Sequence, residues 1–436
     1  MINERVFKEQ LLENIAKLFE QYVKRYDDSV VPIMKARGYT CIHSTERTVA
    51  FTFGEFTFRR RRWKKGKQWV VPVDEELGLE KNTRYSKELM YQIAQLSTMM
   101  SYDNVVKVIQ LMYRIIITKP TVVKAVKQCH KLLEERKEYQ SYQYNKRGKE
   151  KAGVIFVEGD GFLLKACSDY KDSHYFDFSH FVVHTGSQPL SETRAKLQGK
   201  KEFVSLDSRK LRLEVLEYLY SRFDITEETV LITNSDGGKG YTPYVFKELA
   251  SDLGINQHEH FWDAYHVTQY LKQFYKALPD ELYQKAQKAV QKHDKSQLRM
   301  VLDTTESLLK ADEEIDQFQK FKNKLLKNFQ YTKPAVLRGI HHDGIGIMES
   351  QHRKITYRMK RRGMYWSLEG AEAMSQMILL AHEDSLRELF FGNWKEEYDK
   401  IQTIEGMSGG EIKAIENRKY RPTMPTGKIT WKNFKP

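Results

Sequence analysis

The sequence predicts an α/β domain with an all-α insertion, preceded by a small antiparallel β-meander and a helical module. Short apolar runs such as Val154–Val157 and Val230–Thr233 alternate with helical stretches, which is typical of buried strands in an α/β layer. Residues 267–337 are rich in Lys, Gln, Leu and Glu and contain no clear strand. Nearer the N-terminus, alternating residues between 49 and 73 predict the meander, and residues 86–138 predict three short helices.

Length, charge and cysteine content limit the class of protein. The chain has 436 residues, which at roughly 150 residues per domain suggests two or three modules. Lys and Arg number 72 against 58 Asp and Glu, and the net charge of +14 favours nucleic acid as a partner over mere solubility. No apolar stretch is long enough for a membrane helix, and the charged N-terminus argues against a signal peptide. Three scattered cysteines exclude a disulfide scaffold, so we expect a cytoplasmic protein without a membrane partner.

The N-terminal part divides into segments 1–40, 41–80 and 81–140. Apolar residues at helical spacing between 6 and 23 predict an amphipathic helix in the first segment. The meander of the second carries a dense basic run, which is either a phosphate-binding ribbon or a charged edge that prevents aggregation. The third fits a helix-turn-helix-like DNA-binding module, although many small helical bundles do not bind DNA. The residues expected to contact DNA here are Arg59, Arg60, Arg61, Arg62, Lys64, Lys65, Lys124 and Lys127.

Residues 141–152 are polar and charged, and they predict a linker. The α/β layer then occupies residues 153–266, the all-helical insertion residues 267–337, and the last part of the layer residues 338–436. Within the layer we expect strands at residues 154–157, 175–184, 202–206, 230–233 and 260–262, and helices at residues 211–223 and 242–253.

Two aspartates follow buried strands of the predicted layer. Asp160 has a glycine on either side, and Asp236 precedes Gly237-Gly238. Acids at the ends of adjacent central strands project into one cleft, and glycines allow a phosphate backbone to approach closely. Glu349 opens a strongly basic helix and supplies a third carboxylate, so the three acids could hold two hard cations. Each acid could instead be a helix cap or a turn residue.

The side chains around these acids give weaker signals. Asp263 and His266 lie one helical turn apart, and we expect them to brace the metal ligands through hydrogen bonds rather than bind metal. Glu158 is a weaker ligand candidate, and His341-His342-Asp343 is more typical of an exposed turn. The residues expected to contact DNA beside Glu349 are Arg353, Lys354, Arg358, Lys360 and Trp366, with Trp366 equally acceptable as a core residue.

These motifs together resemble a known family. Asp160 in VEGDG, Asp236 in ITNSDGG, DAYH at 263–266 and Glu349 in GIMESQHRKITYRMKRRGMYW resemble bacterial insertion-sequence transposases of the ISLre type, which were long catalogued as an uncharacterised protein family. Their relatives are the Mutator-like DDE transposases. The resemblance implies an RNase H-like catalytic domain with a helical insertion before the final glutamate. It also implies Asp160, Asp236 and Glu349 as catalytic residues and ligands of a two-metal Mg²⁺ site, with Mn²⁺ as an alternative ion.

The implied function is transposition of an insertion sequence. The protein would bind terminal inverted repeats, cleave DNA at the element ends and join the freed 3′-hydroxyls to target DNA. Because two ends must be handled together, we expect a nucleoid-associated homodimer or higher oligomer on DNA. Two alternatives remain at this point: a non-catalytic DNA-binding regulator derived from a transposase, and an RNase H-fold nuclease without strand transfer.

Overall fold

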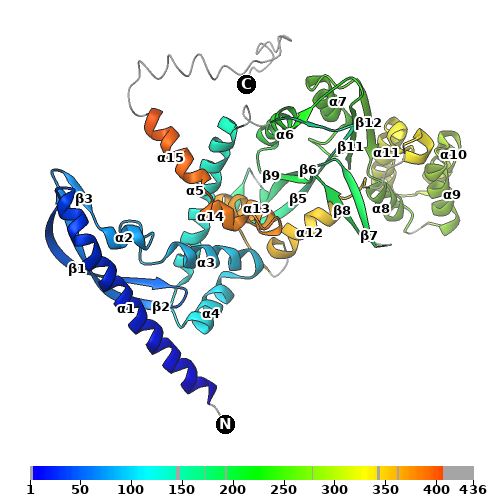
Figure 1. The fold of residues 1–436 in the computed structure, drawn as a ribbon. Helices are drawn as coiled ribbons and strands as arrows, with labels where there is room; N and C mark the ends of the chain where they lie inside the picture. Colours follow the sequence, from blue (N-terminus) through cyan, green and yellow to red (C-terminus); the bar gives the residue numbers. More distant parts are fainter. Residues whose placement is uncertain are drawn as a thin grey trace. The chain divides into compact units, whose positions relative to one another are not determined.

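The computed structural model describes residues 3–143, 148–171, 173–191, 194–276, 278–340, 344–360 and 363–405 (Figure 1). They form two compact units, of which the first contains residues 3–139 and 380–405 and the second residues 140–379. Across the described ranges, no helix has the length and apolar character needed to span a membrane. The predicted turn at residues 341–343, the middle of the predicted linker and the tail from residue 406 lie outside these ranges.

The first unit begins with a long helix that packs on a three-stranded sheet (Figure 1). The predicted meander is confirmed as an antiparallel sheet of order β1-β2-β3. Helix α1 is longer than its predicted periodic run, because its second half buries Val23, Val30 and Met34 against the sheet. The elements are α1 (Glu4–Ala36), β1 (Thr40–Phe51), β2 (Gly54–Lys65), β3 (Gln68–Val70) and α2 (Pro72–Glu76).

Helices make up the rest of the first unit. The hydroxyls of Ser86 and Ser101 accept hydrogen bonds from the first turns of α3 and α4, which explains where these two helices start. The three predicted helices are confirmed, but the third continues to Gln143, so residues 141–143 of the predicted linker are helical. Helix formers such as Glu, Lys and Gln fill this polar stretch. The elements are α3 (Lys87–Met99), α4 (Tyr102–Tyr113), α5 (Lys119–Gln143), α14 (Leu386–Phe391) and α15 (Trp394–Glu405).

The second unit is built on a five-stranded mixed sheet of order β12-β11-β5-β6-β9. Strands β5, β6 and β9 are antiparallel neighbours, whereas β11 and β12 run parallel to β5. The five strands are β5 (Val154–Tyr170), β6 (Ser173–His184), β9 (Lys201–Ser205), β11 (Val230–Ser235) and β12 (Gln257–Trp262). All five predicted strands are present, but β5 continues past Asp160 to Tyr170, because β6 pairs with it after β11 has ended. A hairpin that the sequence did not predict is formed by β7 (Gly186–Ser191) and β8 (Arg194–Gln198), which pair with each other.

The two faces of this sheet carry different kinds of side chain. On one face, Ile155 and Val157 of β5 join a core with helices α6 (Ser208–Arg222) and α7 (Pro243–Asp252). On the other face, Glu158 and Asp160 alternate with these residues, and helix α12 (Met348–Met359) packs against β5. The catalytic candidates therefore lie on the α12 face of the sheet.

The helical insertion is confirmed between β12 and α12, and it has its own apolar core that includes Leu271, Leu302 and Phe318. Its elements are α8 (Ala264–Phe274), α9 (Asp280–Gln291), α10 (Lys295–Leu308), α11 (Asp312–Lys327) and the short 3₁₀ helices η2 (Phe329–Thr332) and η3 (Ala335–Arg338). The remaining elements are the short strands β4 (Glu150–Lys151) and β10 (Phe223–Asp224), which pair in parallel, and helix α13 (Leu368–His382).

Candidate active site

The register of β5 and β11 brings Asp160 and Asp236 together. The parallel ladder ends at the pair Ser235 and Gly159, so the next residue of each strand is one of the two aspartates. Strand β11 ends there because Gly237 adopts a positive φ of +67°, which favours glycine. Burial raises the pKa of Asp236, and the nearby charge of Asp160 raises it further. The two carboxylates therefore share one partly dehydrated site.

Each of these carboxylates has one oxygen bound by the backbone and one that faces the site. Asp160 Oδ1 accepts a hydrogen bond from the amide of Gly161 at 2.7 Å, and Asp236 Oδ1 accepts one from the amide of Gly238 at 2.7 Å. Asp160 Oδ2 lies 3.6 Å from His266 Nε2. For Asp236 Oδ2, no hydrogen bond is found with any described residue. In both carboxylates, the hydrogen bond from the neighbouring glycine amide thus goes to Oδ1 and not to Oδ2.

Gly159 is required for a reason other than the one the sequence suggested. A Cβ atom at this position would lie 2.6 Å from the ring of Phe181 and 2.9 Å from the ring of Tyr241. The absent side chain therefore makes room for packing on the α6 and α7 face of the sheet, and it does not open the site to a phosphate backbone.

Two histidines complete the immediate surroundings of Asp160. His352 of α12 is buried, and its Nδ1 lies 3.7 Å from Asp160 Oδ2. Burial lowers the pKa of His352 to about 3, so this ring is neutral near pH 7. The polar contact with Asp160 raises the pKa of His266 and outweighs its burial. Sequence reasoning missed His352, although it stands one helical turn after Glu349.

Glu349 lies at the border of this group. It is an exposed residue in the first turn of α12, and the face of the helix that packs on the sheet carries Met348, His352 and Ile355. Residues three apart share one side of a helix, so Glu349 stands on the side of His352. Over the residues that the structure describes, no set of three or more His, Cys, Asp or Glu side chains is arranged to hold a metal ion. The structure thus brings Asp160 and Asp236 together and leaves Glu349 outside a closed cage.

The donor set fits a divalent cation in its chemistry. Two carboxylates with inward oxygens are the hard ligands that Mg²⁺ prefers. Asp236 is half-buried beside a second negative charge, and a cation between the two carboxylates would relieve that repulsion.

Glu158 and Asp263 make hydrogen bonds with the segments that flank the site. Glu158 is buried and accepts hydrogen bonds from the backbone amides of Gly346 and Ile347, which lead into α12. Burial raises the pKa of Glu158 to about 8. Asn234 donates to both Glu158 and Asp263, at 3.0 and 3.2 Å. Asp263 also caps α8 by accepting the amides of its first turn. These acids hold the segments that carry the candidate ligands.

Three of the residues expected to grip DNA beside Glu349 have inward contacts instead. Lys354 Nζ lies 2.6 Å from Glu202 Oε1, and its side chain is 19% exposed. Arg358 is buried, with its guanidinium 5.4 Å from the centre of the Trp366 ring. Trp366 is buried too, and its Nε1 donates to the backbone oxygen of Met359. Trp366 is thus a core residue, because its ring packs under α12. Of the five residues expected to contact DNA beside Glu349, only Arg353 and Lys360 are exposed.

The basic run of β2 is likewise divided between inward and outward residues. Arg60 pairs with Asp74 at 2.9 Å, and Arg61 pairs with Asp27 and Asp28, both at 2.9 Å. Lys65 donates to the backbone oxygen of Arg37. These three cations stabilise the first unit itself. Arg59 is exposed, whereas Arg62 and Lys64 are half-buried and lie 5.0 and 5.3 Å from the centre of the Trp69 ring.

A basic cleft of about 430 Å³ lies in the first unit, between the segment from Gly78 to Met90 and helix α5. Lys124 and Lys127, both exposed, line it. Its acidic lining residues are Glu80 and Glu135. Its cationic lining residues are Arg84, Lys87, Lys124, Lys127, Lys131 and Lys395. The excess of positive charge makes this basic cleft a candidate phosphate-binding surface.

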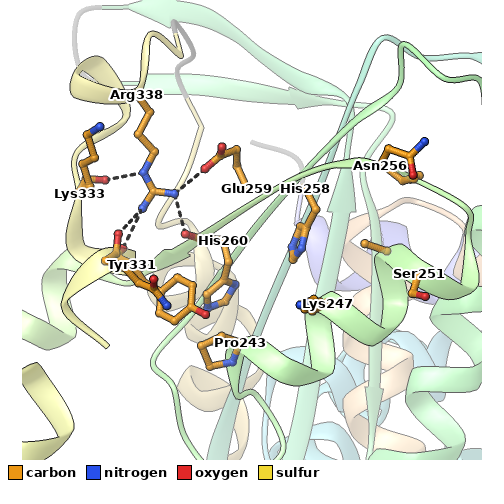
Figure 2. A pocket seen from close by; sticks show the side chains of 13 residues that line it. Pro243, Lys247, Ser251, Asn256, His258, Glu259, His260, Tyr331, Lys333 and Arg338 are labelled. Atoms are coloured by element: carbon orange, nitrogen blue, oxygen red, sulfur yellow. Dashed lines mark hydrogen bonds and ion pairs between the residues drawn. The ribbon is translucent and has the colours of Figure 1, made fainter. Parts of the chain in front are cut away.

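A larger cavity of about 720 Å³ lies in the second unit, between α7, β12 and the segment around η2 (Figure 2). Figure 2 shows Arg338 reaching the Glu259 carboxylate and the backbone oxygens of His260, Tyr331 and Lys333. The guanidinium also lies 3.9 Å from the centre of the Phe261 ring. With its donors used in this way, Arg338 ties the end of the helical insertion to β12.

Comparison with known proteins gives a family match, and one relative and one solved structure are reported with it. The profile of the Uncharacterised protein family (UPF0236) matches residues 2–396. A "UPF0236 protein in vanSb 3'region" from Streptococcus gallolyticus is 30% identical over 379 residues, which cover 86% of this chain and 80% of that protein. Among solved structures, the "Drosophila P element transposase strand transfer complex" is 10% identical, with 77% of this chain and 90% of that chain covered at a TM-score of 0.23. A TM-score this low carries no argument about function.

Proposed function

We propose that this chain, which belongs to the uncharacterised protein family UPF0236, is the metal-dependent DNA transposase of an insertion sequence. The observation that carries the proposal is the pairing of Asp160 and Asp236 at the end of one parallel ladder, opposite the helix that bears Glu349. The mixed sheet and the helical insertion between β12 and α12 support an RNase H-like core, since the resembled family places such an insertion before its final glutamate.

In this proposal Asp160, Asp236 and Glu349 hold Mg²⁺, with Mn²⁺ as an alternative. A bound divalent cation would supply activation of water or a 3′-hydroxyl and stabilisation of the leaving oxygen at phosphorus. Glu349 is exposed in the first turn of α12, on the side of the helix that carries His352. The contact with Asp160 raises the pKa of His266, which favours the protonated form of this ring beside the carboxylates.

DNA would be held by exposed cations at two places. In the first unit these are the cations of the basic cleft and the exposed Arg59 of β2, and in the second they are Arg353 and Lys360 of α12. Contacts of this kind bind the phosphate backbone, so affinity would fall steeply with salt. Because two element ends must be processed together, a homodimer or higher oligomer would form on DNA.

The test is a cleavage and joining assay on duplexes that carry the sequences flanking the gene. The wild-type chain should nick these duplexes only with Mg²⁺ or Mn²⁺ and should join the freed 3′ ends to a second DNA. Asp236→Asn should abolish cleavage and leave DNA binding nearly intact. Asp252→Asn, at an exposed position of α7, is the matched control and should cleave normally.

The outcomes separate the alternatives. Cleavage without joining would identify a nuclease, and metal-independent DNA binding without any cleavage would identify a regulator. Retained cleavage in Asp236→Asn would remove the proposed ligand set altogether.

A further inference from the structure

A buried cluster of charges lies between the sheet and α12, next to the candidate active site. Its centre is Glu202 of β9, whose side chain is 1% exposed. Lys354 of α12 and Lys200 reach Glu202 Oε1 at 2.6 and 2.5 Å. On the other side, His180 Nε2 of β6 lies 3.3 Å from Glu202 Oε2. Glu202, itself in β9, thus contacts strand β6 and the helix that carries Glu349.

This cluster is continuous with the catalytic candidates. The ring of His180 stacks on that of His352, with centroids 5.1 Å apart and planes inclined by 29°. His352 in turn faces Asp160 Oδ2. Glu202 therefore touches α12 directly through Lys354 and indirectly through the two stacked rings. Both points of contact lie within five residues of Glu349 along the same helix.

Glu202 remains ionised although it is buried. Burial alone would raise its pKa, but the contact with His180 and the charges of Lys354 and Lys200 hold the pKa well below its usual range. A buried ion pair adds little stability compared with apolar side chains of similar size. It does, however, require defined geometry, because each partner loses much of its stabilisation when the other moves away. The charged cluster around Glu202 is therefore better suited to orienting α12 on the sheet than to raising the stability of the fold.

We propose that Glu202 is a positioning residue that fixes how α12 lies on the sheet, and thereby how Glu349 and His352 stand relative to Asp160 and Asp236. The inference rests on the proposed function for the identity of the metal ligands. The contact that it assigns to Lys354 is structural, so this lysine serves the site without touching DNA.

The first experiment needs no metal and no substrate. Hydrogen exchange of the intact chain is followed in peptides from α12 and from β11, for Glu202→Gln and for Lys354→Met. Both variants should increase the exchange rate of the α12 amides at least tenfold and leave the β11 amides unchanged. The matched controls are Glu228→Gln and Lys210→Met, which remove the same charges from exposed positions and should exchange like the wild type.

The second experiment measures cleavage of the same flanking duplexes against Mg²⁺ concentration. A displaced but intact ligand set binds metal more weakly, so both variants should need at least fivefold more Mg²⁺ for half-maximal cleavage. Saturating Mg²⁺ should restore most of their rate, whereas Asp236→Asn should stay inactive at every concentration.

Three results would decide against the proposal or limit it. Wild-type exchange in α12 together with a wild-type Mg²⁺ response would overturn it. Exchange that accelerates equally in α12 and β11 would also overturn it, because Glu202 would then only stabilise the unit as a whole. A wild-type chain that never cleaves would refute the proposed function instead, and the exchange experiment would still decide whether Glu202 holds α12.

Discussion

His260 makes the stability of the second unit sensitive to mild acid. It is buried in β12, and its Nδ1 lies 2.8 Å from the hydroxyl of Thr233 (Figure 2 shows the surrounding cavity). Burial lowers the pKa of His260 to about 3, with further lowering by the charges of His258 and Arg338. The unfolded chain, by contrast, takes up this proton near pH ~6.5. The contribution of His260 to folding stability is therefore complete above that pH, and it is lost as the pH falls from there toward 3.

The size of the effect follows from this difference. Between pH 7.5 and 5.0 the unfolded state binds a proton at His260, whereas the folded state does not. The free-energy difference builds up over the about 1.5 pH units below the unfolded pKa, at about 1.4 kcal/mol for each pH unit. The expected loss is about 2 kcal/mol. It hardly depends on the exact value of the folded pKa, because any value well below 5 leaves the folded ring neutral throughout this range.

The assay is urea unfolding at pH 7.5 and 5.0, with hydrogen exchange of β11 and β12 used to identify the transition of the second unit. His260→Asn keeps a polar group beside Thr233 but cannot take up a proton. Its stability should change about 2 kcal/mol less between the two pH values than that of the wild type. His352 is also buried with a low pKa, but it contributes equally to both proteins and cancels. An equal pH response of the two proteins would refute the reasoning.

Three further predictions test other parts of the structure. Arg61→Ala should destabilise the first unit by about 2 kcal/mol, because it leaves the buried carboxylate of Asp27 without its cation, and thermal unfolding would measure this. The double variant of Lys124→Gln with Lys127→Gln should weaken DNA binding and reduce the slope of log K against log salt by about 2, and an unchanged slope would show that the basic cleft does not contact phosphates. Phe246→Ala should cost about 3–5 kcal/mol in urea unfolding, since its ring is fully buried between the sheet and α7, and a loss below 1 kcal/mol would contradict this packing.

The sequence was sufficient for the five strands of the main sheet and for the helical character of the insertion, because these patterns reflect local burial. Val154–Val157 is apolar because this part of β5 lies inside the sheet, and the end of β11 carries glycines that only a turn requires. The pairing of Asp160 with Asp236 could be anticipated from parallel strands that end together.

The sequence was insufficient where a charge meets a distant partner. The basic composition of α12 is typical of a DNA-binding helix. Lys354 and Arg358 nevertheless contact Glu202 and Trp366, which lie in other segments of the chain. The sequence around Lys354 and Arg358 does not indicate which distant residue each of them contacts. The return of residues 380–405 to the first unit could not be predicted for the same reason, since it depends on contacts made far along the chain.

The helical insertion is joined to the sheet of the second unit at both of its ends, and its helices share one apolar core. At its start, Asp263 caps α8 and is held by Asn234, and at its end Arg338 is fixed to β12. The apolar core of the insertion also contains Trp262 of β12, whose Nε1 donates to the backbone oxygen of Asp236 at 2.7 Å. Packing changes inside the insertion would therefore reach Asp236 through this tryptophan, whereas substitutions on the exposed surface of α9 and α10 would leave the contact in place.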